Sequence, residues 1–110
     1  MMSPWAVEVL NETVEAELLA LPKDMQARFL KISEILQSFG PQHVGMPHVR
    51  PLGDKLWEMR LTGSAGIGRA IYTAASGQRL VVLHAFAKKT QKTPQRAINL
   101  ARKRLREIRA

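Results

Sequence analysis

The sequence of 110 residues predicts an α+β fold, in which an antiparallel sheet packs against helices. Two observations support this prediction. Apolar residues at helical spacing lie before residue 40 and after residue 93, and three strand-like segments separated by short glycine-containing turns lie between them. With 45% apolar residues, the chain suits one hydrophobic core. We therefore expect a single domain over residues 1–110, with the element order β-α-α-β-β-β-α.

The first two elements are short. Residues 5–10 (Trp-Ala-Val-Glu-Val-Leu) contain the β-branched and aromatic residues typical of a strand. Residues 12–21 place apolar side chains on one helical stripe, and either Asn11 or Thr13 is suitable as the N-cap.

The second helix has the clearest boundaries in the chain. Pro22 fits its first turn, where a missing N–H does no harm. Met25, Ile32 and Leu36 recur at helical spacing, which predicts that this stripe belongs to the core. Gly40, followed by a proline, ends the helix.

Residues 41–54 contain three prolines and two glycines, which predict a loop between the helices and the sheet. Strands follow over residues 56–62, 67–74 and 79–87, and their short connections imply an antiparallel meander. The segment 63–68 is rich in glycine but joins two strands, so it predicts a hairpin rather than a nucleotide-binding loop.

The last helix follows Thr93, a possible cap, and Pro94 at its first position. Its apolar seam is narrow and consists of Ile98, Ala101, Leu105 and Ile108. We expect the N-terminal helices to pack on one face of the sheet. The other face can stay open to solvent, because antiparallel sheets tolerate a solvated face.

Charge is divided unevenly along the chain. Residues 1–49 hold three basic and six acidic side chains, a net charge of −3, whereas residues 50–110 hold fourteen basic and three acidic ones, a net charge of +11. A C-terminal half this basic favours binding to polyanions. A solvated basic surface with no specific partner is the alternative interpretation.

Several site classes are disfavoured. The chain has no cysteine, which excludes disulfides and thiolate metal sites. His43 and His48 lie in the proline-rich loop without a matching carboxylate pattern, so we predict no metal site. No apolar run is long enough to span a membrane, and the N-terminus does not resemble a signal peptide, so we expect a cytoplasmic protein without membrane association.

Basic residues on the strands are the informative feature. Arg60 and Arg69 lie within two of the predicted strands, and Lys88 and Lys89 follow the third. On one exposed face they would form a cationic cleft that binds a phosphodiester. His84 lies within the third strand, either as a packed core histidine or as a catalytic group.

Longer strings in the sequence resemble a known family over about residues 5 to 106. The most specific string is His84-Ala85-Phe86-Ala87-Lys88-Lys89-Thr90-Gln91-Lys92-Thr93-Pro94. The others are Leu21-Pro22-Lys23, Phe39-Gly40-Pro41, Pro47-His48-Val49-Arg50-Pro51-Leu52-Gly53-Asp54, Leu56-Trp57-Glu58-Met59-Arg60 and Arg69-Ala70-Ile71-Tyr72. Together they resemble the phage-derived, HigB-like branch of the RelE/ParE superfamily of type II toxin–antitoxin systems.

This resemblance implies a RelE-like fold and a toxin that inhibits translation by cutting mRNA on the ribosome, without metal or cofactor. The ribose 2′-OH attacks the adjacent phosphate in this reaction. The resemblance implies phosphate contacts by Arg69 and Arg60, and charge stabilisation by Lys88 and Lys89. The further residues expected to dock RNA are Lys92, Arg50, Arg96 and Lys103.

The sequence leaves two alternatives open. Some relatives carry a Tyr or His near the C-terminus as acid or base, and this chain has neither there, so Glu58 and His84 are the candidates for proton transfer. ParE-type toxins share the fold but bind DNA gyrase, so a gyrase inhibitor or a non-catalytic RNA-binding module is the alternative. The expected protein partner is a cognate antitoxin with a helix-turn-helix DNA-binding domain.

Overall fold

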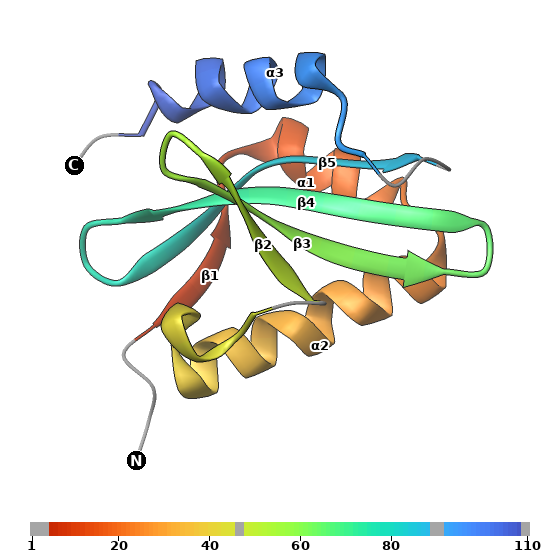
Figure 1. Cartoon of the computed structure of the whole chain (residues 1–110), viewed down its shortest axis with the longest axis horizontal. Helices are drawn as coiled ribbons and strands as arrows, with labels where there is room; N and C mark the ends of the chain where they lie inside the picture. The colour runs from red at the N-terminus through yellow and green to blue at the C-terminus, as the bar shows by residue number, and fades with distance from the viewer. Residues whose placement is uncertain (1–4, 46–47, 89–91, 109–110) are drawn as a thin grey trace.

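The computed structural model of the chain describes residues 5–45, 48–88 and 92–108. A five-stranded sheet with strand order β1-β5-β4-β3-β2 forms the centre of the molecule (Figure 1). The elements in chain order are β1 Ala6–Val9, α1 Glu12–Leu19, α2 Lys23–Phe39, a short 3-10 helix Pro41–His43, β2 Val49–Gly53, β3 Leu56–Gly63, β4 Gly66–Ala75, β5 Arg79–Lys88 and α3 Gln95–Leu105. The predicted α+β class is confirmed, with one strand more than expected.

The additional strand, β2, lies within the segment that we predicted to be a loop. It pairs antiparallel with β3 at the edge of the sheet. Pro51 has no N–H to donate, and an edge strand tolerates this because its outer side has no partner strand to accept a hydrogen bond. Asp54 and Lys55 both have positive φ, 53° and 66°, and turn the chain sharply into β3. The loop prediction was therefore wrong for residues 49–53.

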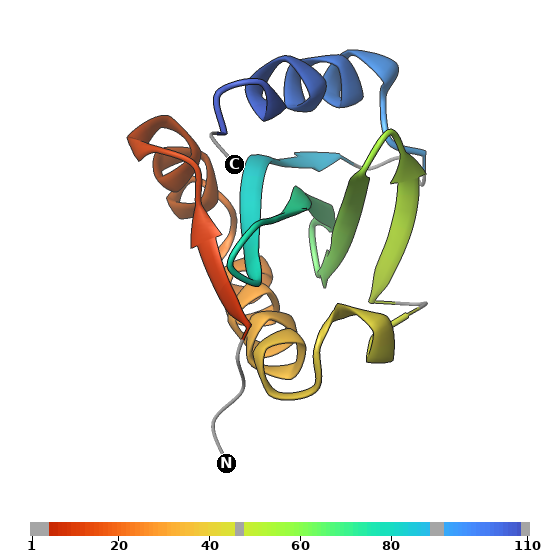
Figure 2. The same ribbon diagram turned by 90° about the vertical axis from the view of Figure 1, so that its left-hand side faces the viewer.

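The two faces of the sheet are covered by different helices (Figure 2). α1 and α2 bury one apolar cluster, with Val14, Ile32 and Leu36 packed against strand residues. α3 packs on the opposite face, where Ala97 and Ala101 join a smaller apolar cluster that includes β4 and β5 residues. The second face is thus covered in part and not left open, because two alanines allow α3 to lie close to the strands.

Capping residues mark the ends of the three helices. Asn11 is the N-cap of α1, and its Oδ1 accepts a hydrogen bond from the backbone N–H of Val14 at 3.0 Å. Gly40 ends α2 with a φ of 85°, a conformation that favours glycine. At α3 the prediction differs from the structure: Pro94 is the N-cap, and the Thr93 hydroxyl is directed to Glu58 instead of capping the helix.

β1 leaves part of β5 exposed as an edge. β1 is parallel to β5 and pairs with residues 79–82, so that, within the described part of the chain, no strand pairs with the second half of β5 on that side. None of the described helices combines the length and apolar character needed to cross a bilayer.

Candidate nucleic-acid interface

Most of the predicted site residues lie on the face of the sheet that α3 partly covers, here called the α3 face. Paired residues of neighbouring strands point to the same face and lie about 5 Å apart. Strand pairing places four residues side by side in one row across β2 to β5: Arg50, Glu58, Ile71 and His84. The next row across β3 to β5 consists of Arg60, Arg69 and Phe86. Residues from four separate strands are therefore neighbours on one surface.

Lys88 belongs to the same face. It pairs with Ile67, which lies two residues before Arg69 on β4, and its side chain is half-buried at the end of β5. Arg60, Arg69 and Lys88 thus all point to the α3 face. Lys89 lies outside the described residues.

His84 reaches this face because of a β-bulge. Ile71 pairs with His84 and Tyr72 with Val82, so Leu83 is an extra residue in β5. Strict alternation from Val82 would place His84 on the other face. A bulge shifts this alternation, and bulges are common beside functional sites.

The centre of the cluster is a buried ion pair. The Glu58 and Arg69 side chains are both fully buried, and Arg69 Nε lies 3.7 Å from Glu58 Oε1. Arg50 Nε lies 3.8 Å from Glu58 Oε2, and the Thr93 hydroxyl donates a hydrogen bond to Glu58 Oε1. We expected Arg69 on an exposed surface, whereas the structure places it beneath one.

The charge balance around Glu58 is positive. Burial lowers the pKa of the Arg69 guanidinium, the Glu58 carboxylate raises it, and the charges of Arg60 and Arg50 lower it. An arginine guanidinium stays protonated under such conditions. Two guanidinium groups, those of Arg50 and Arg69, therefore lie beside one carboxylate, and the charge of Arg60 acts on Arg69 as well. The excess positive charge attracts an anion to this part of the surface.

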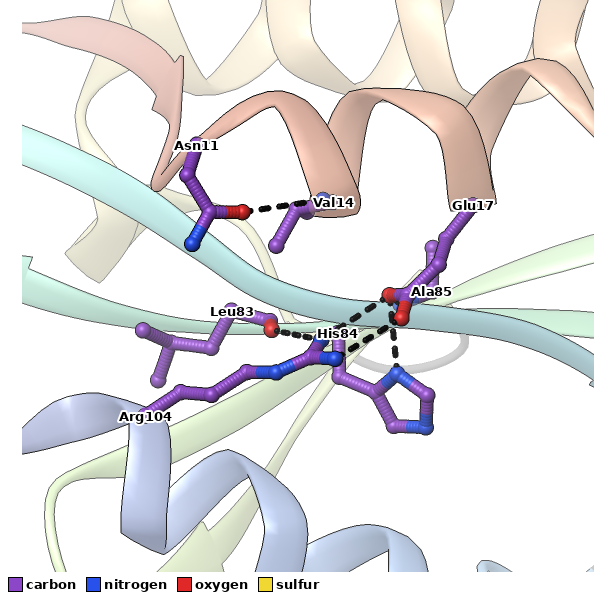
Figure 3. A network of polar contacts seen from close by, with 7 residues as sticks. All are labelled: Asn11, Val14, Glu17, Leu83, His84, Ala85 and Arg104. Atoms are coloured by element: carbon purple, nitrogen blue, oxygen red, sulfur yellow. Dashed lines mark hydrogen bonds and ion pairs between the residues drawn. The ribbon is translucent and has the colours of Figure 1, made fainter.

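A second polar network joins α1, β5 and α3 (Figure 3). Glu17 Oε1 lies 2.9 Å from His84 Nδ1 and accepts hydrogen bonds from Ala85 N–H and Arg104 Nη1, both at 3.1 Å. Arg104 Nη1 also donates to the Leu83 carbonyl oxygen at 2.8 Å. Glu17 and Arg104 thus satisfy the backbone of β5 where β1 no longer covers its edge.

This network also orients His84. A carboxylate accepts hydrogen bonds only, so His84 Nδ1 carries the proton directed to Glu17. In the neutral imidazole the second ring nitrogen, Nε2, is then the basic one, and Figure 3 shows it turned away from Glu17. Sequence reasoning missed Glu17, because it lies 67 residues from His84 on a helix with several similar glutamates.

Glu17 should contribute stability that depends on pH. Burial raises the pKa of its carboxyl group, but hydrogen bonds from Arg104, His84 and Ala85 outweigh burial and lower it. The resulting stability is fully present above the ordinary value of 4.5 and is lost as pH falls through the lowered pKa. We expect Glu17→Gln to reduce the free energy of unfolding at pH 7 by about 1–3 kcal/mol. Urea denaturation at several pH values measures this loss.

The loss should shrink as pH falls below 4.5, because the carboxyl group of the unfolded wild-type chain is then protonated, and it should be smallest below the lowered pKa, where the folded carboxyl group is protonated as well. Glu34→Gln, at an exposed position on α2, is the matched control and should have little effect. An equal loss for Glu17→Gln at all pH values would contradict this assignment.

The remaining predicted residues lie around the cluster. Arg96 is exposed on the first turn of α3, and Lys103 is exposed two turns later on the same side of that helix. Lys92 is exposed in the segment before α3. Between β5 and the start of α3 lies a groove of about 270 Å³, whose lining includes His84, Phe86, Lys88 and Arg96. Among the described residues, no three His, Asp or Glu side chains are grouped as metal ligands.

The comparisons with known proteins agree with this architecture. Residues 16–106 match the family described as "Phage derived protein Gp49-like". A chain in the crystal structure of the archaeal RelE-RelB complex from Pyrococcus horikoshii OT3 is similar in fold, with a TM-score of 0.56 and 22% sequence identity. The similarity covers 81% of this chain and 99% of the archaeal one. No curated protein matches the sequence. The chain thus belongs to the phage-derived Gp49-like family and has a RelE-like fold.

Proposed function

We propose that the protein is the toxin of a type II toxin–antitoxin pair and acts as a metal-independent endoribonuclease on ribosome-bound mRNA. One observation carries the proposal. A buried Glu58–Arg69 pair, the basic side chains of Arg60 and Lys88, and an oriented histidine, His84, lie on one face of the sheet. This set provides charge for a phosphodiester and a base for a hydroxyl proton.

The chemistry is an intramolecular transfer. The ribose 2′ oxygen attacks the adjacent phosphorus, the new P–O2′ bond forms and the P–O5′ bond breaks, which leaves a 2′,3′-cyclic phosphate. His84 Nε2 accepts the proton of the 2′-OH, since Nδ1 is already engaged with Glu17. A proton from the Lys88 ammonium or from water neutralises the departing 5′ oxygen.

The cationic residues stabilise the charge that develops on the phosphate. Arg60 and Lys88, both half-buried, reach solvent and contact the phosphate oxygens. Arg69 acts from below, through its charge and by fixing Glu58 between the guanidinium groups. Low exposure strengthens this effect, because charges in a partly desolvated site are screened less.

Glu58 is a positioning residue in this scheme. Its side chain is fully buried, and its oxygens face Arg50, Arg69 and Thr93. A carboxylate in these surroundings is poorly placed to take a proton from a substrate at the surface. His84 lines an open groove and is the better candidate for proton transfer.

The surrounding basic residues extend the interface. Arg50, Lys92, Arg96 and Lys103 dock the RNA backbone near this site. Lys89, which follows Lys88 in the sequence, contributes to charge stabilisation and RNA docking. A cognate antitoxin, of the helix-turn-helix type, covers the site in the inactive state, and the toxin acts in the cytoplasm.

The test uses purified protein and ribosomes programmed with a defined mRNA. We expect cleavage that persists in EDTA, yields 2′,3′-cyclic phosphate ends and stops when the nucleotide 5′ to the cut carries a 2′-deoxyribose. Intact mRNA in this assay, with an early DNA-damage response in cells, would support a gyrase-directed toxin instead. Intact mRNA with stable RNA binding would support a non-catalytic module.

A further inference from the structure

The groove between β5 and the N-terminal turn of α3 has the features of a site for an aromatic ring. Its lining combines an aromatic side chain, Phe86, with Pro94 and the aliphatic side chains of Ala97 and Leu100. Cationic groups, Lys88 and Arg96, line it as well. Apolar walls with cations at the rim suit a flat heteroaromatic group attached to an anion.

Phe86 and His84 form one aromatic surface at this groove. Their ring centroids lie 4.9 Å apart and the planes are inclined by 28°, which is a stacked arrangement. Glu17 holds the His84 ring through Nδ1, so the surface is fixed in orientation before any ligand arrives. A preorganised ring pair of this kind can stack a further ring at low entropic cost.

The position of the groove relates it to the phosphate site. Phe86 pairs directly with Arg69 across β4 and β5, and Lys88 follows two residues later on the same face. Adjacent strands are separated by about 5 Å, comparable to the distance between the phosphate and base of one nucleotide. A phosphate bound near Arg60 and Arg69 would therefore carry an adjoining base over Phe86.

We infer that this groove binds a nucleobase of single-stranded RNA next to the scissile phosphate, with Phe86 as the stacking residue. The inference rests on the proposed function and adds the subsite that holds the base. Because every base has an aromatic face, stacking alone gives affinity and positions the ribose without strict sequence preference.

Phe86→Leu tests the inference, because leucine keeps apolar bulk but removes the aromatic face. We expect cleavage of mRNA on programmed ribosomes to slow by about 10- to 100-fold. Phe86→Tyr, which retains the ring, should stay within about threefold of wild type. Phe39→Leu, at a 65% exposed phenylalanine on α2, is the control for loss of a phenylalanine elsewhere.

An abasic nucleotide separates stacking from indirect effects on His84. It is placed on either side of the scissile phosphate, one side at a time. On one of these two RNAs, wild type and Phe86→Leu should cut at equal rates, because the base that stacks is absent. A persistent defect on both, or no defect on natural mRNA, would overturn the inference. If wild type cuts no RNA, the proposed function itself fails, which is a distinct outcome.

Discussion

Replacing Glu58 and Arg69 together, as E58L/R69M, should leave the protein folded and reduce growth arrest by at least about 100-fold. A buried ion pair replaced by apolar residues of similar volume is often neutral or stabilising. Both side chains are fully buried, so the double variant removes two charges without leaving either one unpaired. Thermal unfolding and the survival of cells expressing the variant measure the two effects separately.

The single change Arg69→Ala should behave differently. It leaves the Glu58 carboxylate buried beside Thr93 with one ionic partner lost, which costs about 3–5 kcal/mol of stability. Loss of toxicity in that variant alone could therefore arise from unfolding. The double variant D54N/R102M removes the partly exposed ion pair between α3 and the β2–β3 turn, at 2.7 Å, and serves as the control. A folded E58L/R69M variant that arrests growth like wild type would show that the buried pair has only a structural role.

His84→Gln should lower the rate of mRNA cleavage by about 100- to 10,000-fold, the usual contribution of a general base. Glutamine can still accept a hydrogen bond but cannot take up the 2′-OH proton. Single-turnover cleavage on programmed ribosomes isolates this step, and ribosome binding should change little. The stacked contact with Phe86 at 4.9 Å and the bond to Glu17 make His84 part of the structure too, so folding is checked by thermal unfolding.

Glu58→Gln distinguishes the two candidates for proton transfer. The amide keeps the shape of the side chain and can still accept the hydrogen bond from Thr93. We expect its rate loss to be under about tenfold when measured below its unfolding temperature. A folded Glu58→Gln variant that is as inactive as His84→Gln would assign the base to Glu58 instead.

The main elements of the fold could be predicted because local signals marked their ends. Pro22 and Gly40 bound α2, and glycine-containing turns separate the three central strands. β2 could not be predicted in the same way. Its Pro51 and Gly53 are typical of a loop, and only the free edge of β3 makes them acceptable in a strand.

The site was predictable in part. Alternation along β3 and β4 places Arg60 and Arg69 on one face, and this needs no knowledge of the tertiary structure. The face on which His84 lies depends on the bulge at Leu83. No residue of β5 indicates this bulge in the sequence. Glu58, the buried partner of Arg69, accepts a hydrogen bond from Thr93, which lies 35 residues further along the sequence. Long-range contacts of this kind determine whether a side chain is exposed to solvent. The periodicity of apolar residues in the sequence does not predict such contacts.

The most direct measurement compares two pairs of charge reversals with the same change in net charge. Arg60→Glu with Lys88→Glu alters the α3 face, whereas Lys23→Glu with Lys31→Glu alters exposed positions on α2. Cleavage of ribosome-bound mRNA should fall by more than about 100-fold for the first pair and stay within about threefold for the second. Equal losses for both folded variants would mean that bulk charge alone attracts the RNA, and an unchanged rate for the first pair would contradict an active site on the α3 face.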